Sequence, residues 1–148
     1  FGILVTYAVI FGVNSMSKTP EGLGVKNGLL STCPSSPNCV SSQASPEDKE
    51  HFIEALSYTT SEIALMAKID ELVEEWPRAQ ILTQSEDYYH LVMTTMLFRF
   101  KDDFEIYVDR KNKQVHFRSA SRVGYSDFGT NRKRVTRFKE RLLLLLKS

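Results

Sequence analysis

The segment FEIYVD, residues 104–109, alternates between apolar and polar side chains without a break. This period of two predicts a strand whose apolar side chains are buried on one face of a sheet. A polar turn at residues 110–113 follows, and Val115 to Ser119 resumes the alternation. Because so short a connection joins antiparallel neighbours, the two segments predict a β-hairpin.

The chain before this hairpin predicts two more strands, Ala79 to Thr83 and Tyr88 to Phe100. The longer one is rich in aromatic, β-branched and methionine side chains, which are typical of strands. The connections are short, so we expect an antiparallel meander of about four strands with one buried face.

Two helices are predicted to pack on one face of this sheet, which makes the fold class α+β. The first has a capping box, with Thr59 at its start and Glu62 three residues later, and it ends before Pro77. Its apolar stripe comprises Ile63, Met66, Ile69, Val73 and Trp76, widened by Leu65 and Leu72. The second helix runs from about Arg132 to Lys147, with a stripe of Val135, Phe138, Leu142 and Leu145. The leucine run from 142 to 146 exceeds one stripe, which predicts contact with a second element, a membrane or a partner subunit.

The first 13 residues, FGILVTYAVIFGV, are almost wholly apolar. They are too few to cross a bilayer, which takes about 20 residues, but they fit the end of a membrane-anchor helix. The apolar region of a signal peptide is one alternative, although no clear cleavage site follows it. A buried core helix or strand is the other. Residues 14–30 contain Pro20 and three glycines without apolar periodicity, so we expect a tether there and a single α+β domain over residues 31–148. Within that domain, Ser45-Pro46 indicates a short helix, and residues 52–58 fit either its end or a short strand.

The only cysteines, Cys33 and Cys39, enclose a turn-forming PSSPN spacer. In an oxidising compartment they would form a disulfide, which is our expectation. Reduced thiols, metal binding and redox chemistry are the alternatives. Zinc needs two further ligands, and the three histidines show no metal-ligand spacing. We therefore predict no metal site and no cofactor.

Charge is distributed unevenly along the 148 residues, although the net charge is only +1. Residues 45–109 hold 15 acids and 5 bases, whereas residues 118–148 hold 9 bases and 2 acids. The first interpretation is that the two segments pair within the fold. The second is a basic surface for an anionic partner. Nucleic acid is not predicted as that partner, because no recognition motif accompanies the basic segment.

The stretch FRSASRVGYSDFGTNRKR, residues 117–134, concentrates arginines, hydroxyls and glycines without apolar periodicity. The forked guanidinium group of arginine pairs with carboxylates of the same chain or binds an anion from outside it. The candidate ligand- or partner-binding residues are Arg118, Ser119, Ser121, Arg122, Asp127, Asn131 and Arg132. Our hypothesis is that the three arginines of this set mainly form internal ion pairs with Asp102, Asp103 and Asp127. An open anion site is the alternative.

No known catalytic template fits the sequence. Gly124 and Gly129 have the spacing of a phosphate-binding loop, but the lysine that should follow is missing. Ser-His-Asp catalysis would require His90 or His116 to meet a serine, and the chain has no nucleophile-elbow pattern. We predict no catalytic residues and leave enzymatic activity open.

Three motifs together resemble the family known as domain of unknown function fourteen ninety-nine, found in bacteria and photosynthetic eukaryotes. They are CPSSPNCVSSQ, KDDFEIYVD and RSASRVGYSDFGTNRKR, and the match runs from about Leu30 to Leu146. The resemblance implies a small domain, commonly exported or membrane-tethered, with no established activity. It therefore supplies no catalytic residues.

Two functions are expected from these features. The first is a membrane-tethered accessory or assembly subunit that faces the periplasm or the thylakoid lumen and binds a membrane complex. The alternative is a small-ligand or anion-binding domain, which could be an enzyme, centred on the arginine-rich stretch. The position of those arginines discriminates between the two functions. They either line an open pocket or form ion pairs with internal carboxylates.

Overall fold

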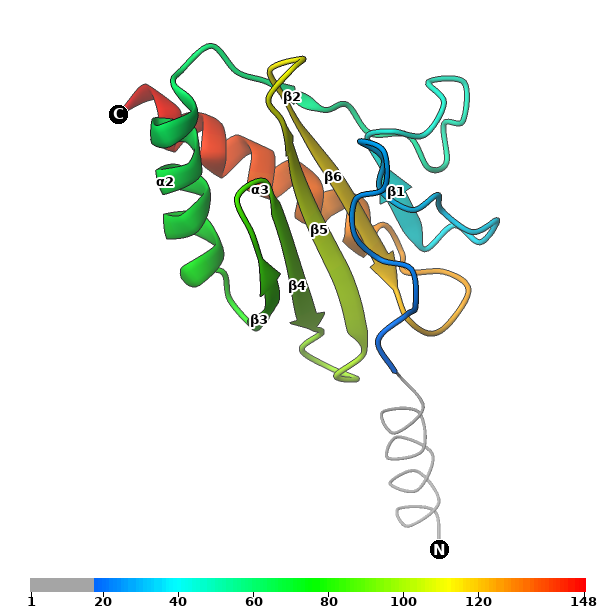
Figure 1. Cartoon of the computed structure of the whole chain (residues 1–148). Helices are drawn as coiled ribbons and strands as arrows, with labels where there is room; N and C mark the ends of the chain where they lie inside the picture. The colour runs from blue at the N-terminus through cyan, green and yellow to red at the C-terminus, as the bar shows by residue number, and fades with distance from the viewer. Residues whose placement is uncertain (1–17) are drawn as a thin grey trace, which may run out of the picture.

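A computed structural model describes residues 18–148 of the chain. The predicted membrane anchor, residues 1–13, and the first part of the predicted tether lie outside the described residues. The described chain is an α+β domain in which an antiparallel sheet packs against two helices (Figure 1).

The sheet has six strands within residues 18–148, rather than the four predicted. They are β1 (Cys39–Ser41), β2 (Leu56–Ser57), β3 (Ala79–Gln84), β4 (Tyr88–Thr94), β5 (Lys101–Asp109) and β6 (Gln114–Ser121). Their order in space is β1-β6-β5-β4-β3, and β2 pairs with another part of β6. β1 and β2 have only three and two residues, too few to show a period in the sequence. Residues 45–50, where the sequence indicates a short helix, form turns.

The predicted strand from Tyr88 to Phe100 was too long, because β4 ends at Thr94. The following residues form a turn, in which the amide of Thr95 donates to the carbonyl of Phe100 at 2.9 Å. Arg99 in this turn has a positive φ of 54°, a left-handed conformation that strands do not contain. The chain must reverse here because β4 and β5 pair antiparallel along their length.

The two helices are α2 (Glu62–Glu74) and α3 (Thr130–Lys147). The N-cap of α2 is Ser61, whose hydroxyl accepts a hydrogen bond from the amide of Ala64 at 3.2 Å, so the predicted cap at Thr59 was wrong. The predicted apolar stripe also included one misplaced residue, because Ile63 is 86% exposed. The buried residues of α2 are Leu65, Ile69, Leu72 and Val73.

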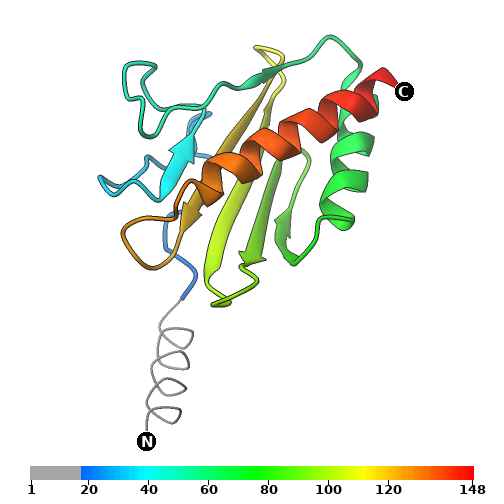
Figure 2. The same ribbon diagram turned by 180° about the vertical axis from the view of Figure 1, so that it is seen from behind.

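Alternation along the strands separates an apolar face of the sheet from a polar face. α3 crosses the apolar face, and α2 packs beside α3 (Figure 2). Phe138 of α3 lies in the centre of the core, with its ring centroid 5.1 Å from that of Trp76 and 5.2 Å from that of Phe104. The inward residues predicted for the hairpin are buried as expected; they are Phe104, Ile106, Val108, Val115 and Phe117.

Residues 18–30, which the sequence assigns to the tether, run over the polar face of the sheet (Figure 1). The backbone amide of Gly24 donates to Glu105 on β5 at 3.0 Å. The side chain of Gln43 accepts from the amide of Leu30 at 2.8 Å and donates to the carbonyl of Gly28 at 2.9 Å. These contacts hold the segment against the sheet, and they shield part of the polar face from water.

Candidate functional site

The predicted site residues lie at the end of β6, in the loop after it and at the start of α3. Successive side chains of a strand point to opposite faces, so Arg118 and Ser119 lie on different sides of the sheet. The predicted set therefore separates into two arginines on the polar face, a cluster on the helix face, and Arg132.

Arg118 is buried on the polar face, where its Nη1 lies 3.2 Å from Oε2 of Glu105. Glu105 is fully buried, and its Oε1 accepts from the Tyr88 hydroxyl at 2.7 Å and from the amide of Gly24 at 3.0 Å. Burial, reinforced by the neighbouring carboxylate, raises the pKa of Tyr88 and keeps its phenol protonated as a donor. Nε of Arg118 is one of two buried side-chain polar atoms without a hydrogen-bond partner in residues 18–148.

Arg122 forms a two-pronged ion pair with Asp103. Its Nε lies 2.9 Å from Oδ2 and its Nη2 lies 2.8 Å from Oδ1, while Nε2 of His90 lies 2.7 Å from the same Oδ1. Burial alone would raise the pKa of Asp103, but the hydrogen bonds from His90 and Arg122 outweigh burial and lower that pKa. The side chains of Arg122 and Asp103 are 5% and 2% exposed, so this pair is buried in the structure rather than open to an outside anion.

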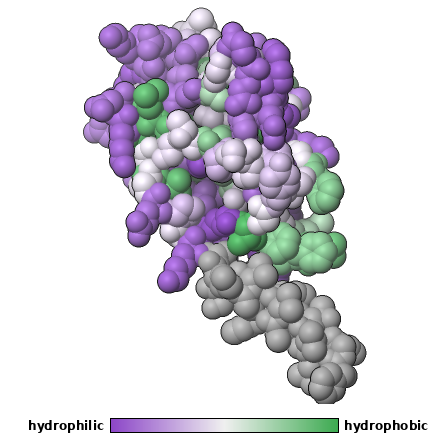
Figure 3. Space-filling view, turned by 90° about the vertical axis from the view of Figure 1, so that its right-hand side faces the viewer, coloured by the Kyte–Doolittle hydropathy of each residue, from purple (hydrophilic) through white to green (hydrophobic). Residues whose placement is uncertain are grey.

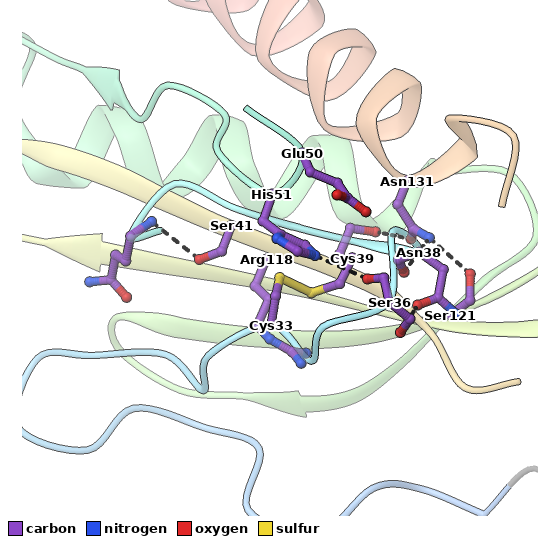
Figure 4. Close-up of a disulfide and its surroundings, with 12 residues drawn as sticks. Cys33, Ser36, Asn38, Cys39, Ser41, Glu50, His51, Arg118, Ser121 and Asn131 are labelled. Atoms are coloured by element: carbon purple, nitrogen blue, oxygen red, sulfur yellow. Dashed lines mark hydrogen bonds between the residues drawn. A yellow bond between two sulfur atoms is a disulfide. The ribbon is translucent and has the colours of Figure 1, made fainter. Parts of the chain in front are cut away.

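The other four predicted residues meet on the helix face around the fully buried Asn131. Its Oδ1 accepts from the Ser119 hydroxyl at 2.7 Å, and its Nδ2 donates to Ser121 Oγ at 2.9 Å and to Asp127 Oδ2 at 2.7 Å. The same Nδ2 donates to the carbonyl of Asn38 at 3.2 Å (Figure 4). Asp127 also accepts from the amide of Asn131 at 2.9 Å, and so it pairs a backbone amide of the first turn of α3, whose N-cap is Gly129.

Arg132 lies apart from both groups. Its guanidinium donates to the backbone carbonyl of Phe52 at 2.8 Å and to that of Glu50 at 3.0 Å. It thus ties the start of α3 to the loop before β2, and it forms no ion pair with a carboxylate of residues 18–148.

Three ion pairs join the acidic segment to the basic segment, namely Arg118–Glu105, Arg122–Asp103 and Arg134–Asp102. The predicted internal pairing of the two charged segments is therefore confirmed. The predicted partners were right only for Arg122 with Asp103. Asp102 instead pairs with Arg134, and Asp127 accepts from the backbone amides of Gly129 and Asn131 at the start of α3.

A serine and a histidine that the sequence did not connect also meet in the fold. Ser42 Oγ lies 3.0 Å from Nδ1 of His116 and accepts from the amide of Phe117 at 2.9 Å. Burial lowers the pKa of His116, which favours the neutral imidazole. Oδ2 of Asp109 lies 4.0 Å from Nε2 of His116, beyond hydrogen-bond distance. The hydrogen bond between Ser42 and His116 therefore joins the residue after β1 to strand β6. It does not make Ser42 an activated nucleophile, because no carboxylate of residues 18–148 lies within hydrogen-bond distance to orient His116.

Cys33 and Cys39 form the predicted disulfide, with a Cα–Cα distance of 5.7 Å. Cys39 on β1 pairs with Ala120 on β6, so the bridge lies on the polar face beside Arg118 (Figure 4). The Asn38 carbonyl, which Asn131 contacts, belongs to the loop that the disulfide closes. The bridge therefore restrains the loop whose Asn38 carbonyl accepts a hydrogen bond from Asn131.

Reducing this disulfide should lower the free energy of unfolding by about 2 kcal/mol, the loop-entropy value for so short a loop. That loss corresponds to roughly 6 °C in Tm for a domain of this size. Mass spectrometry of unreduced protein after alkylation should label neither cysteine. A Cys33→Ser/Cys39→Ser variant is the control, because reductant should not change its Tm. Two labelled cysteines in the unreduced protein would contradict the bridge.

No group of three or more His, Cys, Asp or Glu side chains in residues 18–148 is arranged to hold a metal ion. No helix within the same residues has the length and apolar character needed to cross a membrane.

Comparison with known proteins yields one family. No curated protein and no solved structure matches the chain significantly. The family model described as Protein of unknown function (DUF1499) matches residues 29–142, which include the disulfide, the whole sheet and most of α3. This range covers more than half of the chain and contains the three motifs that carry the resemblance. The chain therefore belongs to the DUF1499 family.

Proposed function

We propose that the protein is a membrane-tethered accessory subunit that faces the periplasm or the thylakoid lumen and works by binding a protein of a membrane complex. The observation that carries this proposal is a set of exposed apolar side chains at one end of the domain. Met96, Leu97 and Phe98, in the turn between β4 and β5, are 78%, 81% and 52% exposed. Tyr125 and Phe128, in the loop between β6 and α3, are 71% and 89% exposed.

These two loops lie at the end of the domain where the described chain begins (Figure 1, Figure 2). Figure 3 views the domain from another side, with apolar side chains gathered at this same end. We name the set Met96, Leu97, Phe98, Tyr125 and Phe128 the apolar end. The apolar sequence of residues 1–13 precedes the described chain, so a membrane anchor there would hold the apolar end close to the bilayer.

The composition of the apolar end favours a protein partner. Phenylalanine, tyrosine and methionine are enriched in the centres of protein interfaces, as is arginine, and Arg99 adjoins Phe98. The disulfide supports an oxidising compartment. The alternative anion site at Arg118 and Arg122 has less support, because both guanidinium groups are buried in ion pairs.

Photo-crosslinking in native membranes tests this proposal. A photoreactive amino acid in place of Leu97, in the full chain, should give a protein adduct of one reproducible mass. The matched control carries the same amino acid at Lys111, in the turn at the opposite end of β5. Lipid adducts alone at position 97, or the same adducts from both positions, would refute binding of a protein partner through the apolar end.

A further inference from the structure

A second surface feature lies between the start of α3 and the end of β4. It is a cleft of about 410 Å³. One wall is α3, with Thr130 at its first turn, and the other is formed by Thr94, Thr95 and the turn that follows them. None of the predicted site residues lines this cleft, although Arg134 of the same sequence motif does.

The lining of the cleft is strongly cationic. Four basic side chains contribute to it, namely Arg78, Lys133, Arg134 and Arg137, and no carboxylate of residues 18–148 does. Arg134 is already paired with the buried Asp102 at 2.6 Å. The other three form no ion pair within residues 18–148, so about three positive charges face the cleft without a counter-ion. Such a field attracts an anion and is only partly screened at physiological salt.

The cleft is held in place by contacts that do not need a ligand. The carbonyl of Arg78 accepts from the amide of Thr94 at 3.0 Å, which fixes the backbone of Arg78 to the end of β4. The Arg137 guanidinium lies 5.9 Å from the ring centre of Trp76, a cation–π distance that orients it along the wall. The hydroxyl of Thr95 accepts from the amide of Phe100 at 2.9 Å, which leaves its proton for a ligand oxygen.

The rest of the lining is apolar and comprises Trp76, Pro77, Met93, Met96 and Leu97. An inorganic anion would bind to the arginines and threonines but would not need these apolar side chains. A ligand with a phosphate at one end and an apolar body at the other would use both. Arginine forks suit phosphate oxygens, since two parallel N–H donors can meet two of them.

We propose that this cleft is a binding site for the phosphate group of an amphiphilic ligand, such as the headgroup of an anionic phospholipid. Lys133 and Arg137 are one turn apart on the exposed side of α3 and contact the phosphate, while Met96 and Leu97 contact the apolar part. The cleft shares Met96 and Leu97 with the apolar end. Its test does not depend on the proposed protein partner, because binding is measured on the purified chain alone.

Titration of the full chain in a neutral detergent tests the site. The probes are dihexanoyl phosphatidate, dihexanoyl glycerol without the phosphate, and inorganic phosphate. Phosphatidate should bind saturably and at least tenfold more tightly than inorganic phosphate, and dihexanoyl glycerol should not bind. Equal affinities for phosphatidate and inorganic phosphate would overturn the amphiphilic ligand and leave free phosphate as the source.

A pair of double variants gives the decisive comparison. Lys133→Gln/Arg137→Gln should weaken phosphatidate binding at least tenfold, while its Tm stays close to that of the wild type because both side chains are exposed. Arg141→Gln/Lys147→Gln removes the same charge from exposed positions of the same helix outside the cleft and should bind normally. No saturable binding to wild type, or an equal loss in the two variants, would overturn the proposed site.

Discussion

Replacing Arg122 by alanine should lower the free energy of unfolding by about 3–5 kcal/mol, because the change strands a buried carboxylate. Asp103 is 1% exposed, and its remaining partner would be His90 at 2.7 Å. For a domain of this size the loss corresponds to roughly 10–15 °C in Tm, measured by calorimetry at neutral pH. An exposed ion pair would contribute about 1 kcal/mol or less.

Arg110→Ala is the matched control for this prediction. It makes the same substitution at a side chain that is 43% exposed and lies 3.6 Å from Glu62. Its Tm should stay within a few degrees of the wild type. Adding Asp103→Asn to Arg122→Ala should restore part of the loss, since the unpaired buried carboxylate at position 103 is then removed. Equal Tm values for Arg122→Ala and Arg110→Ala would show that the buried pair does not stabilise the fold.

The Arg122→Ala effect should also depend on pH. In the folded protein the pKa of Asp103 lies below its ordinary value. A carboxyl group of this kind stabilises the fold above its ordinary pKa, about 3.9, and the contribution is lost as pH falls through the lowered folded value. The difference between wild type and variant should therefore be largest near neutral pH and should shrink below about pH 4.

The strands that could be predicted are those long enough to show a period. Residues 104–109 fall within β5, and their inward face is as expected. β1 pairs with β6 over Cys39–Ser41, and no pattern in three residues predicts a strand. The chain around Phe98 has strand-like composition, yet it forms a turn because pairing with β5 requires a reversal. Tertiary context outweighs local propensity in both cases.

The arginine-rich stretch could be identified from its composition, but the contacts of its residues depend on the register of the sheet. Arg118 lies directly opposite Glu105. In the sequence, Glu105 occupies an outward position of an alternating strand, where a glutamate is normally solvated. It is fully buried because residues 18–30 run over it, and that segment has no periodicity to reveal its path. The sequence therefore pointed to the neighbouring Asp102 and Asp103 instead.

The cationic cleft could not be predicted for a similar reason. Arg78 follows α2, whereas Lys133 and Arg137 belong to α3, and only the packing of α3 across the sheet brings them together. The charges of Lys133 and Arg137 gave a signal only as part of the excess of bases in residues 118–148, and Arg78 lies in the acidic segment. The pairing of Arg134 with Asp102 neutralises one of the four basic side chains of the cleft and leaves three cations in its lining.

Asn131→Asp should lower the free energy of unfolding by about 3 kcal/mol at neutral pH, although the two side chains have the same shape. The amide Nδ2 of Asn131 donates to the Asp127 carboxylate at 2.7 Å and to the Asn38 carbonyl at 3.2 Å. At neutral pH an oxygen in its place would face two acceptors that carry no proton, and one of them is charged. Nη1 of Arg134, 2.7 Å from Oδ1 of Asn131, would offset only part of this cost. The Ser121 hydroxyl can rotate to donate, so it does not add to the cost. Chemical denaturation at pH 7 measures the loss.

The chain offers a close control for this change. Asn112 donates through Nδ2 to the Asp109 carboxylate, also at 2.7 Å, but in an exposed turn. Asn112→Asp creates the same pair of carboxylates at the surface, with the new carboxylate exposed to water. It should cost about 1 kcal/mol or less, since charges at the surface are screened. The Asn131→Asp loss should also diminish as pH falls toward about 4, because one proton shared by the two adjacent carboxyl groups restores a donor between the oxygens. Equal losses in the two variants would mean that the donors of Asn131 do not hold the start of α3 to the sheet.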